Sequence, residues 1–307
     1  MHSNKVQRST LWLALFTVQL LFALSYIFSK LLMDAFPPMI WALIRSSVTA
    51  VIMIATALLL KRPKPPLTLR FIVPLLLFSI MGGAMTQGLY LLGLHYTSST
   101  NSSILYTLSP LMTLAAVIWI GQEKATLARL LGFLLSFLGV LILSHAESYQ
   151  LSNQRILGDC LTLLSCFSYG LFLALSKSFF EKYDDLWITA GIFSISSLIF
   201  GGFAIRELPQ FHLPTMTPTL AAMILYGILG STLLSYFLVI WTLKRAPSSQ
   251  VALFGYLQPL LTSLISWIFF EEVISDRTLL ATGFILAGVS LTIEWRFLKS
   301  IGQPTRS

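Results

Sequence analysis

Long apolar runs dominate this chain, and the short segments between them carry most of its charged residues. A helix needs about 20 mostly apolar residues to cross a bilayer, and lipid admits only helices and closed barrels because every backbone polar group must be satisfied internally. About ten such runs can be counted. They cover residues 11–33, 39–60, 71–94, 102–120, 127–144, 157–179, 186–205, 219–243, 249–270 and 279–297. The sequence therefore predicts an all-α polytopic membrane protein with about ten transmembrane helices.

The composition excludes an ordinary soluble protein. Of 307 residues, 56% are hydrophobic and 10% are charged, and the mean hydropathy is +0.81, whereas a soluble domain has about 25% charged residues. In a soluble chain, a net charge of +8 would suggest that the protein binds nucleic acid. Here the charged residues lie between the apolar runs, so they indicate membrane orientation instead. We therefore expect a lipid bilayer as partner and no nucleic acid.

The two cysteines, Cys160 and Cys166, lie in one apolar run. They offer neither a disulfide framework nor the spacing of a metal site. We expect them to pack inside the protein, and we expect no metal and no cofactor.

Lysine and arginine are divided unequally between the alternating loops. Cytoplasmic loops retain these residues, and about fifteen lie on one side against three, Arg155, Arg206 and Arg277, on the other. Both termini are therefore expected in the cytoplasm. The run 11–33 is too long for the apolar region of a cleavable signal peptide, so we expect it to be a membrane helix and its own signal anchor.

The second half of the chain restates the first. Pro110 recurs as Pro259 at a shift of 149 residues, and a shift of 147 aligns Phe22 with Tyr169. Because each half holds five spans, an odd number, the halves must insert with opposite orientation. The predicted domains are two inverted five-helix repeats, residues 11–144 and 157–297. The shift of 149 also pairs Leu94 with Leu243, Ser99 with Ser248, Glu123 with Glu272 and Gly139 with Gly288.

The paired prolines lie near the middle of the fourth and ninth spans. Inside a helix, Pro110 and Pro259 would each free a carbonyl four residues earlier, those of Tyr106 and Gly255. Irregular backbone at membrane depth is tolerated where it is buried in protein or lines a water-filled cavity. The pair therefore indicates a substrate path, although a proline can also simply kink a membrane helix.

Arg45 lies well inside the second predicted span, and Lys30 lies near the end of the first. A guanidinium near the bilayer centre costs about 2.5 to 3.5 kcal/mol on insertion scales, so Arg45 needs a partner. That partner is an anionic substrate group, or alternatively the outer interface or helix carbonyls. Lys30 lies four residues before Asp34, and it is either an interfacial anchor or an anion contact.

Neutral polar residues supply the remaining candidates for a binding cavity. Amides, hydroxyls and aromatic rings can bind a small neutral or zwitterionic ligand, but they can also form interfacial belts or helix–helix contacts. No Asp or Glu lies at mid-depth of a span, so no carboxylate proton relay is visible. The predicted substrate-binding residues are Lys30, Arg45, Gln87, Tyr90, Tyr106, Ser109, Pro110, Tyr169, Tyr236, Gln258 and Pro259.

The repeated segments resemble the EamA-type repeat of the drug/metabolite transporter superfamily. The resemblance rests on Leu108-Ser109-Pro110-Leu111, Gln122-Glu123 and Gly139-Val140, with second copies at Leu257-Gln258-Pro259-Leu260, Glu271-Glu272 and Gly288-Val289. It implies a ten-helix inner-membrane permease that moves amino acids or related metabolites, usually outward. The chain lacks the early membrane glutamate typical of the small multidrug-resistance branch, which disfavours a cationic-drug antiporter.

The leading hypothesis is a secondary transporter whose small-molecule substrate binds near mid-depth between the halves. A drug efflux permease and a non-transporting receptor are the alternatives. A membrane-embedded enzyme is disfavoured because no HExxH, GxSxG, paired intramembrane Asp or Cys/His dyad is present. The sequence does not fix the oligomeric state, and a monomer is compatible with it.

Overall fold

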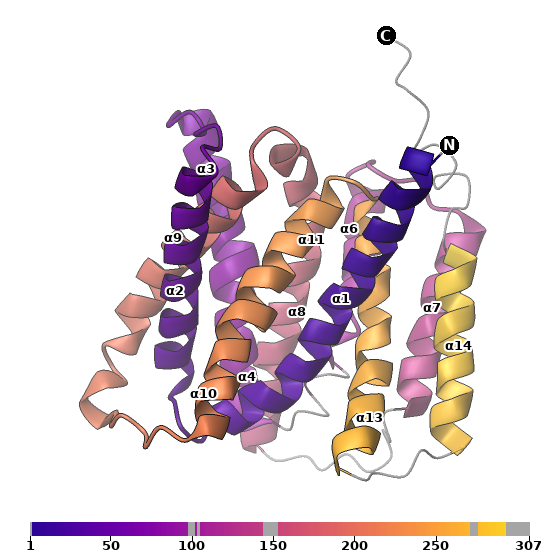
Figure 1. Cartoon of the computed structure of the whole chain (residues 1–307). Helices are drawn as coiled ribbons and strands as arrows, with labels where there is room; N and C mark the ends of the chain where they lie inside the picture. The colour runs from indigo at the N-terminus through magenta and orange to yellow at the C-terminus, as the bar shows by residue number, and fades with distance from the viewer. Residues whose placement is uncertain (1, 98–101, 103–104, 144–152, 271–275, 293–307) are drawn as a thin grey trace.

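The computed structural model describes residues 2–97, 102, 105–143, 153–270 and 276–292, and all secondary structure in these residues is helical (Figure 1). Six helices are long and apolar enough to cross a membrane, and three shorter apolar helices accompany them. Ten spans can be traced as two inverted five-helix repeats, so the predicted fold class is confirmed.

The first repeat begins with two unbroken helices and continues through interrupted ones. Its elements are α1 (His2–Leu32), α2 (Pro38–Leu59), α3 (Leu69–Phe78), the π-helical segment η1 (Ser79–Leu89), α4 (Tyr90–Tyr96), α6 (Ser109–Trp119) and α7 (Leu127–Leu143). A residue of the second repeat caps the start of α2. The carboxylate of Glu207 accepts hydrogen bonds from the N–H groups of Met39 and Ile40, each at 3.0 Å.

The second repeat follows the same plan. Its elements are α8 (Asn153–Phe180), α9 (Asp185–Ala204), the short 3₁₀ turn η3 (Leu208–Gln210), α10 (Pro218–Leu225), the π-helical segment η4 (Tyr226–Leu234), α11 (Ser235–Leu243), α12 (Ser248–Leu253), the 3₁₀ turn η5 (Phe254–Tyr256), α13 (Leu257–Phe270) and α14 (Asp276–Thr292). In both repeats the third span therefore consists of an α-helix, a π segment and a second α-helix.

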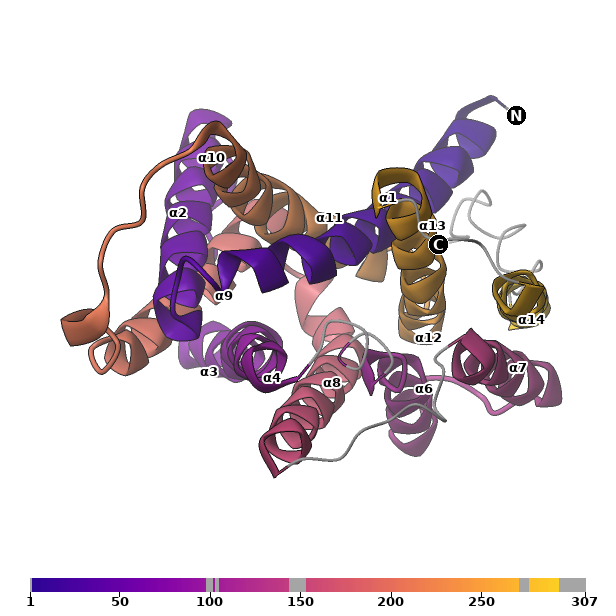
Figure 2. The same cartoon turned by 90° about the horizontal axis from the view of Figure 1, so that it is seen from below.

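The last helices of the two repeats meet on the axis that relates the repeats. Ser136 of α7 donates a hydrogen bond to the carbonyl of Ile285 of α14 at 3.4 Å, and these residues are 149 positions apart. The glycines are reciprocal: a Cβ atom at Gly139 would collide with α14, and one at Gly288 would collide with α7. Equivalent residues can contact each other in this way only near a two-fold axis. Figure 1 and Figure 2 both show α7 and α14 side by side at one end of the molecule.

The prolines differ from the prediction of a kink inside a continuous α-helix. Each lies in the first turn of an α-helix, Pro110 in α6 and Pro259 in α13, directly after an interruption of the regular helix. Proline is tolerated there because the first N–H groups of a helix have no intrahelical partner. The two interruptions lie close together, since a Cβ atom added at Gly255 would be 3.5 Å from Cγ of Pro110.

Candidate functional site

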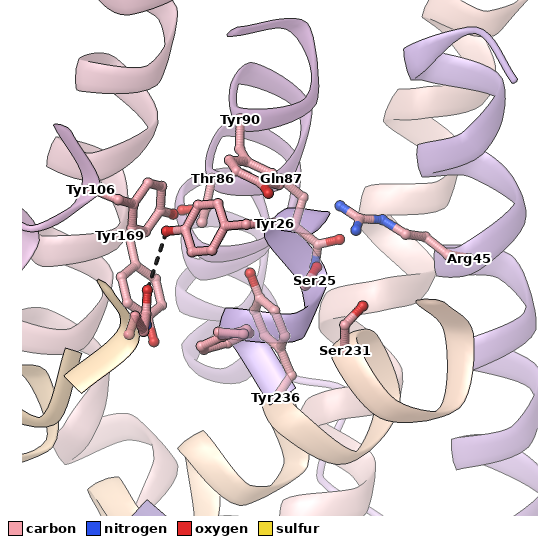
Figure 3. A pocket seen from close by; sticks show the side chains of 12 residues that line it. Ser25, Tyr26, Arg45, Thr86, Gln87, Tyr90, Tyr106, Tyr169, Ser231 and Tyr236 are labelled. Atoms are coloured by element: carbon pink, nitrogen blue, oxygen red, sulfur yellow. Dashed lines mark hydrogen bonds between the residues drawn. The ribbon is translucent and has the colours of Figure 1, made fainter. Parts of the chain in front are cut away.

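A central cavity lies between the repeats, and twelve side chains line it (Figure 3). The cavity volume is about 50 Å³, which is enough for several water molecules but too small for a metabolite. The lining comes from four spans of the first repeat and three spans of the second, so no single stretch of sequence contains the site. The residues are Phe22, Ser25, Tyr26, Arg45, Thr86, Gln87, Tyr90, Tyr106, Tyr169, Ser231, Tyr236 and Gln258.

The π-helical segments deliver polar groups to this cavity. Thr86 and Gln87 belong to η1, and Ser231 belongs to η4. A π turn loosens the regular backbone hydrogen bonding, and hydroxyl groups compensate for it here. Ser165 donates to the carbonyl of Thr86 at 2.6 Å, and Thr232 donates to that of Gly227 at 2.7 Å.

Four tyrosines form an aromatic wall on one side of the cavity (Figure 3). The ring of Tyr26 meets those of Tyr90 and Tyr106 edge to face, with centroids 5.6 and 6.4 Å apart. Tyr106 also lies 6.1 Å from Tyr169. Such contacts hold the rings in place, so that their faces and hydroxyls are oriented before any ligand arrives.

Gln258 is fixed in the cavity by two hydrogen bonds. Its amide oxygen accepts from the hydroxyl of Tyr26 at 3.1 Å, and its amide nitrogen donates to Gln19 at 2.7 Å. The three side chains are buried. This hydrogen-bonded chain connects α13 of the second repeat with α1 of the first, next to the aromatic wall.

Arg45 is the charged residue of the cavity. It lies roughly 10 Å along α2 from the start of that helix, and its side chain is 4% exposed. Its Nε and Nη2 atoms have no hydrogen-bond partner among the described residues. Figure 3 shows its guanidinium extending toward the amide of Gln87, whose nitrogen and oxygen are likewise unpartnered in the described part of the chain.

Two pairs of repeat-related residues face this cavity. Phe22 corresponds to Tyr169 at the shift of 147, and Gln87 corresponds to Tyr236 at the shift of 149. The cavity therefore lies where equivalent parts of the repeats converge, as in transporters whose substrate binds at the repeat interface.

The structure brings together seven of the eleven residues predicted to bind substrate. The seven that line the cavity are Arg45, Gln87, Tyr90, Tyr106, Tyr169, Tyr236 and Gln258. The lining does not include Ser109, Pro110 or Pro259, which lie in the first turns of α6 and α13. Of the two carbonyls singled out in the sequence, that of Tyr106 is 3.8 Å from the thiol sulfur of Cys166, which donates to it.

Lys30 also lies outside the cavity lining. Its ammonium group donates to the carbonyls of Leu94 and Thr97, at 2.7 and 3.0 Å, where α4 ends. The repeat-related Lys177 does the same at the end of α11, donating to the carbonyl of Ala246 at 2.6 Å. Each lysine therefore satisfies carbonyl groups that the helix leaves open.

The predicted substrate-binding residues leave out five residues of the lining: Phe22, Ser25, Tyr26, Thr86 and Ser231. Serine and threonine occur in most of the spans, so their presence alone cannot mark a cavity. The signal for Thr86 and Ser231 is the π-helical geometry, which no sequence pattern predicted here. Within the described ranges, no three His, Cys, Asp or Glu side chains come together as possible metal ligands.

A polar contact joins the repeats at the other end of α6. The carboxylate of Glu123 accepts hydrogen bonds from the backbone N–H of Ser249, at 3.1 Å, and from its hydroxyl group. Arg129 pairs with the same carboxylate at 3.2 Å. Glu123 thus binds the first turn of α12, which leads to Gln258 in the cavity.

Comparison with solved structures supports this fold. One crystal structure superposes with a TM-score of 0.75, covers 96% of this chain and 99% of its own, and is 16% identical in sequence. At that level of identity, the likeness concerns the fold alone.

Sequence relatives are named as uncharacterized transporters or WAT1-related proteins. An uncharacterized transporter of Archaeoglobus fulgidus is 29% identical over 217 residues, 70% of this chain and 73% of the relative. The uncharacterized transporter YetK of Bacillus subtilis is 22% identical over 271 residues, 88% of this chain and 82% of YetK. A WAT1-related protein of Arabidopsis thaliana is 23% identical over 325 aligned positions, 94% of this chain and 85% of that protein.

The profile of the EamA-like transporter family matches twice, over residues 9–145 and 156–293. The matches agree with the apolar helices and with the resemblance of the repeats to the drug/metabolite transporter superfamily. The chain is a multi-pass membrane protein that belongs to the EamA-like transporter family.

Proposed function

We propose that this protein is a secondary transporter that binds a small metabolite in the central cavity and exposes it alternately to the two sides of the membrane. The observation that carries the proposal is the position of the cavity, between inverted repeats and beside interrupted helices. Because about 50 Å³ holds no metabolite, the repeats must move apart for binding, as alternating access requires.

Amino acids or related small metabolites fit the chemistry of the cavity best. Tyrosine hydroxyls, amide groups and one guanidinium can bind both polar ends of such a molecule, while the aromatic rings contact its apolar part. An ammonium group can be bound at the tyrosine faces. Organic cationic drugs fit less well, because Arg45 would repel them.

Export across the inner membrane, with both termini in the cytoplasm, completes the proposal. The orientation rests on the excess of lysine and arginine on one set of loops. The direction of transport rests on the superfamily resemblance. A membrane-embedded enzyme is disfavoured because the described lining residues include no Cys, His, Asp or Glu to act as nucleophile or base.

A bulky residue in the cavity tests this function. Ser231→Trp places an indole among the lining residues, whereas Ser290→Trp makes the same change at an exposed position of α14. In proteoliposomes, we expect saturable amino-acid counterflow from the wild type and Ser290→Trp, and its loss in Ser231→Trp at equal reconstitution. Unchanged counterflow in Ser231→Trp would show that the substrate does not use this cavity.

A further inference from the structure

The described residues that line the central cavity do not compensate its positive charge. Among the described residues that line it, Arg45 alone is charged at neutral pH, and the ionisable groups that interact with it are the neutral tyrosines Tyr90, Tyr106 and Tyr236. A buried charge without a partner is strongly destabilising, so this arrangement needs a compensating anion when water is excluded. The cavity is therefore electrostatically complementary to a ligand with one negative charge.

The unsatisfied donors identify the kind of anion. Nε and Nη2 of Arg45 are buried and unpartnered in the described part of the chain. Guanidinium N–H groups have a planar fork geometry that matches the two oxygens of a carboxylate. The unpartnered amide of Gln87 lies on the same side of the cavity and adds a neutral donor and an acceptor.

A single guanidinium also limits the charge that the cavity can compensate. A phosphate monoester carries about −1.5 to −2 at pH 7, which one arginine cannot balance. A carboxylate carries one charge and leaves the loaded cavity neutral. The described lining contains no carboxylate side chain that could pair with a ligand ammonium group, so a ligand does not need one to bind.

The aromatic wall defines the rest of the ligand. Tyr26, Tyr90 and Tyr106 lie across the cavity from Arg45 in Figure 3, with their rings edge to face. Rings in this position offer an apolar surface to the body of a ligand whose charged end lies at Arg45.

Resting on the proposed transport function, we propose that Arg45 is the specificity-determining residue of the cavity and binds the carboxylate of the substrate. The substrates are then small monocarboxylates with an apolar or aromatic body. Amino acids belong to this class through their carboxylate, and their ammonium group is dispensable.

Four matched compounds test the assignment. 3-Phenylpropanoate carries only the carboxylate, phenylalanine carries both charges, and phenethylamine and phenylalanine amide lack the carboxylate. We expect the first two to bind the purified wild-type protein, measured by thermal shift and equilibrium binding, and the last two to bind at least about tenfold more weakly, equivalent to about 1.4 kcal/mol.

Variants then assign the preference to Arg45. Arg45→Gln should abolish the tenfold preference for carboxylates. Arg45→Lys should weaken carboxylate binding but keep the preference, because the positive charge remains while the planar guanidinium fork is lost. Arg206→Gln, at an exposed position, is the matched control and should bind as the wild type does. If Arg45→Gln does not fold, Arg45→Lys decides: affinity for 3-phenylpropanoate equal to that of the wild type contradicts the assignment.

Other outcomes separate this proposal from the transport function. Wild-type stabilisation by chloride or inorganic phosphate without any by the carboxylates would overturn the assignment. Counterflow of the amide or amine alone would also overturn it while leaving the transporter intact. Carboxylate binding that depends on Arg45, without counterflow of any compound, would instead uphold the assignment and contradict transport.

Discussion

Lys177 donates a hydrogen bond to the carbonyl oxygen of Ala246 at 2.6 Å, and so joins the end of α8 to the end of α11. Lys30 makes the equivalent bond to Thr97 at 3.0 Å. Thr97 and Ala246 are 149 residues apart, so the bond is part of the repeat. Because the repeats are inverted, the two lysines close the third and eighth spans on opposite faces of the molecule.

Replacing either lysine should lower stability. Lys30→Met and Lys177→Met leave helix-end carbonyls without a donor, which costs about 1–3 kcal/mol for a buried acceptor. We expect each to lower the free energy of unfolding in detergent by that amount. Lys182→Met, at an exposed position, should change it by less than about 0.5 kcal/mol. A loss of substrate affinity in Lys30→Met at unchanged stability would instead assign Lys30 to the substrate.

The contact between Glu123 and Ser249 should control access to the start of α12. Glu123→Gln removes the charge that binds Ser249 and Arg129, and hydrogen bonds to a charged group contribute about 1.5–3 kcal/mol. The labelling is done in a parent protein in which both native cysteines are replaced by serine and the buried Ser248 by cysteine. We expect this cysteine to react with an impermeant maleimide about tenfold faster in Glu123→Gln than in the parent.

Glu181→Gln, at an exposed position near the same face, is the control for this labelling experiment. It should leave the rate unchanged. Equal labelling rates in Glu123→Gln and the parent protein would mean that the carboxylate does not hold α12 in place.

The close approach of α7 and α14 should make one glycine of α14 sensitive and another tolerant. A methyl group at Gly288 would collide with Ser136 and the backbone of Gly132, whereas one at Gly283 meets nothing within 4 Å. We expect Gly288→Ala to lower the free energy of unfolding by about 1–3 kcal/mol through overpacking. Gly283→Ala should be neutral or stabilise by up to about 1 kcal/mol. Similar unfolding curves for the two variants would contradict the packing of α7 on α14.

The amide of Gln258 should be needed to orient Tyr26. Gln258→Leu leaves Tyr26 and Gln19 without their buried partner, at a cost of about 1–3 kcal/mol. We expect initial transport rates in proteoliposomes to fall about tenfold or more, with Gln210→Leu, at an exposed position, as the unaffected control. Normal rates in Gln258→Leu would exclude a role for this hydrogen-bonded chain.

The span count and the repeat could be predicted because both depend on the order of residues along the chain. The apolar runs match the described helices closely; for example, the predicted span 219–243 is observed as Pro218–Leu243. The shift of 149 predicted equivalent positions, and Ser136 and Ile285 meet at that separation. The π segments η1 and η4 had no sequence signal, since they differ from an α-helix only in hydrogen-bond register.

The candidate site could be predicted only in part. Amphipathic periodicity identifies the buried face of a soluble helix, but a helix in lipid is apolar on every side, so the pattern does not reveal which face turns inward. Arg45 and Lys30 had the same two alternatives in the sequence. In the structure, Arg45 lies in the cavity, where its Nε and Nη2 atoms have no partner among the described residues, and Lys30 donates to helix-end carbonyls.

The sequence by itself determined that the chain is a helical membrane protein with two inverted repeats, because lipid leaves a long apolar run no alternative to a helix and an odd span count inverts the second copy. Only the tertiary structure decided that four tyrosines converge, that Gln258 binds Tyr26, and that Arg45 stays unpaired beside Gln87 among the described residues. These relations depend on how each helix is rotated about its own axis, which packing between distant segments sets.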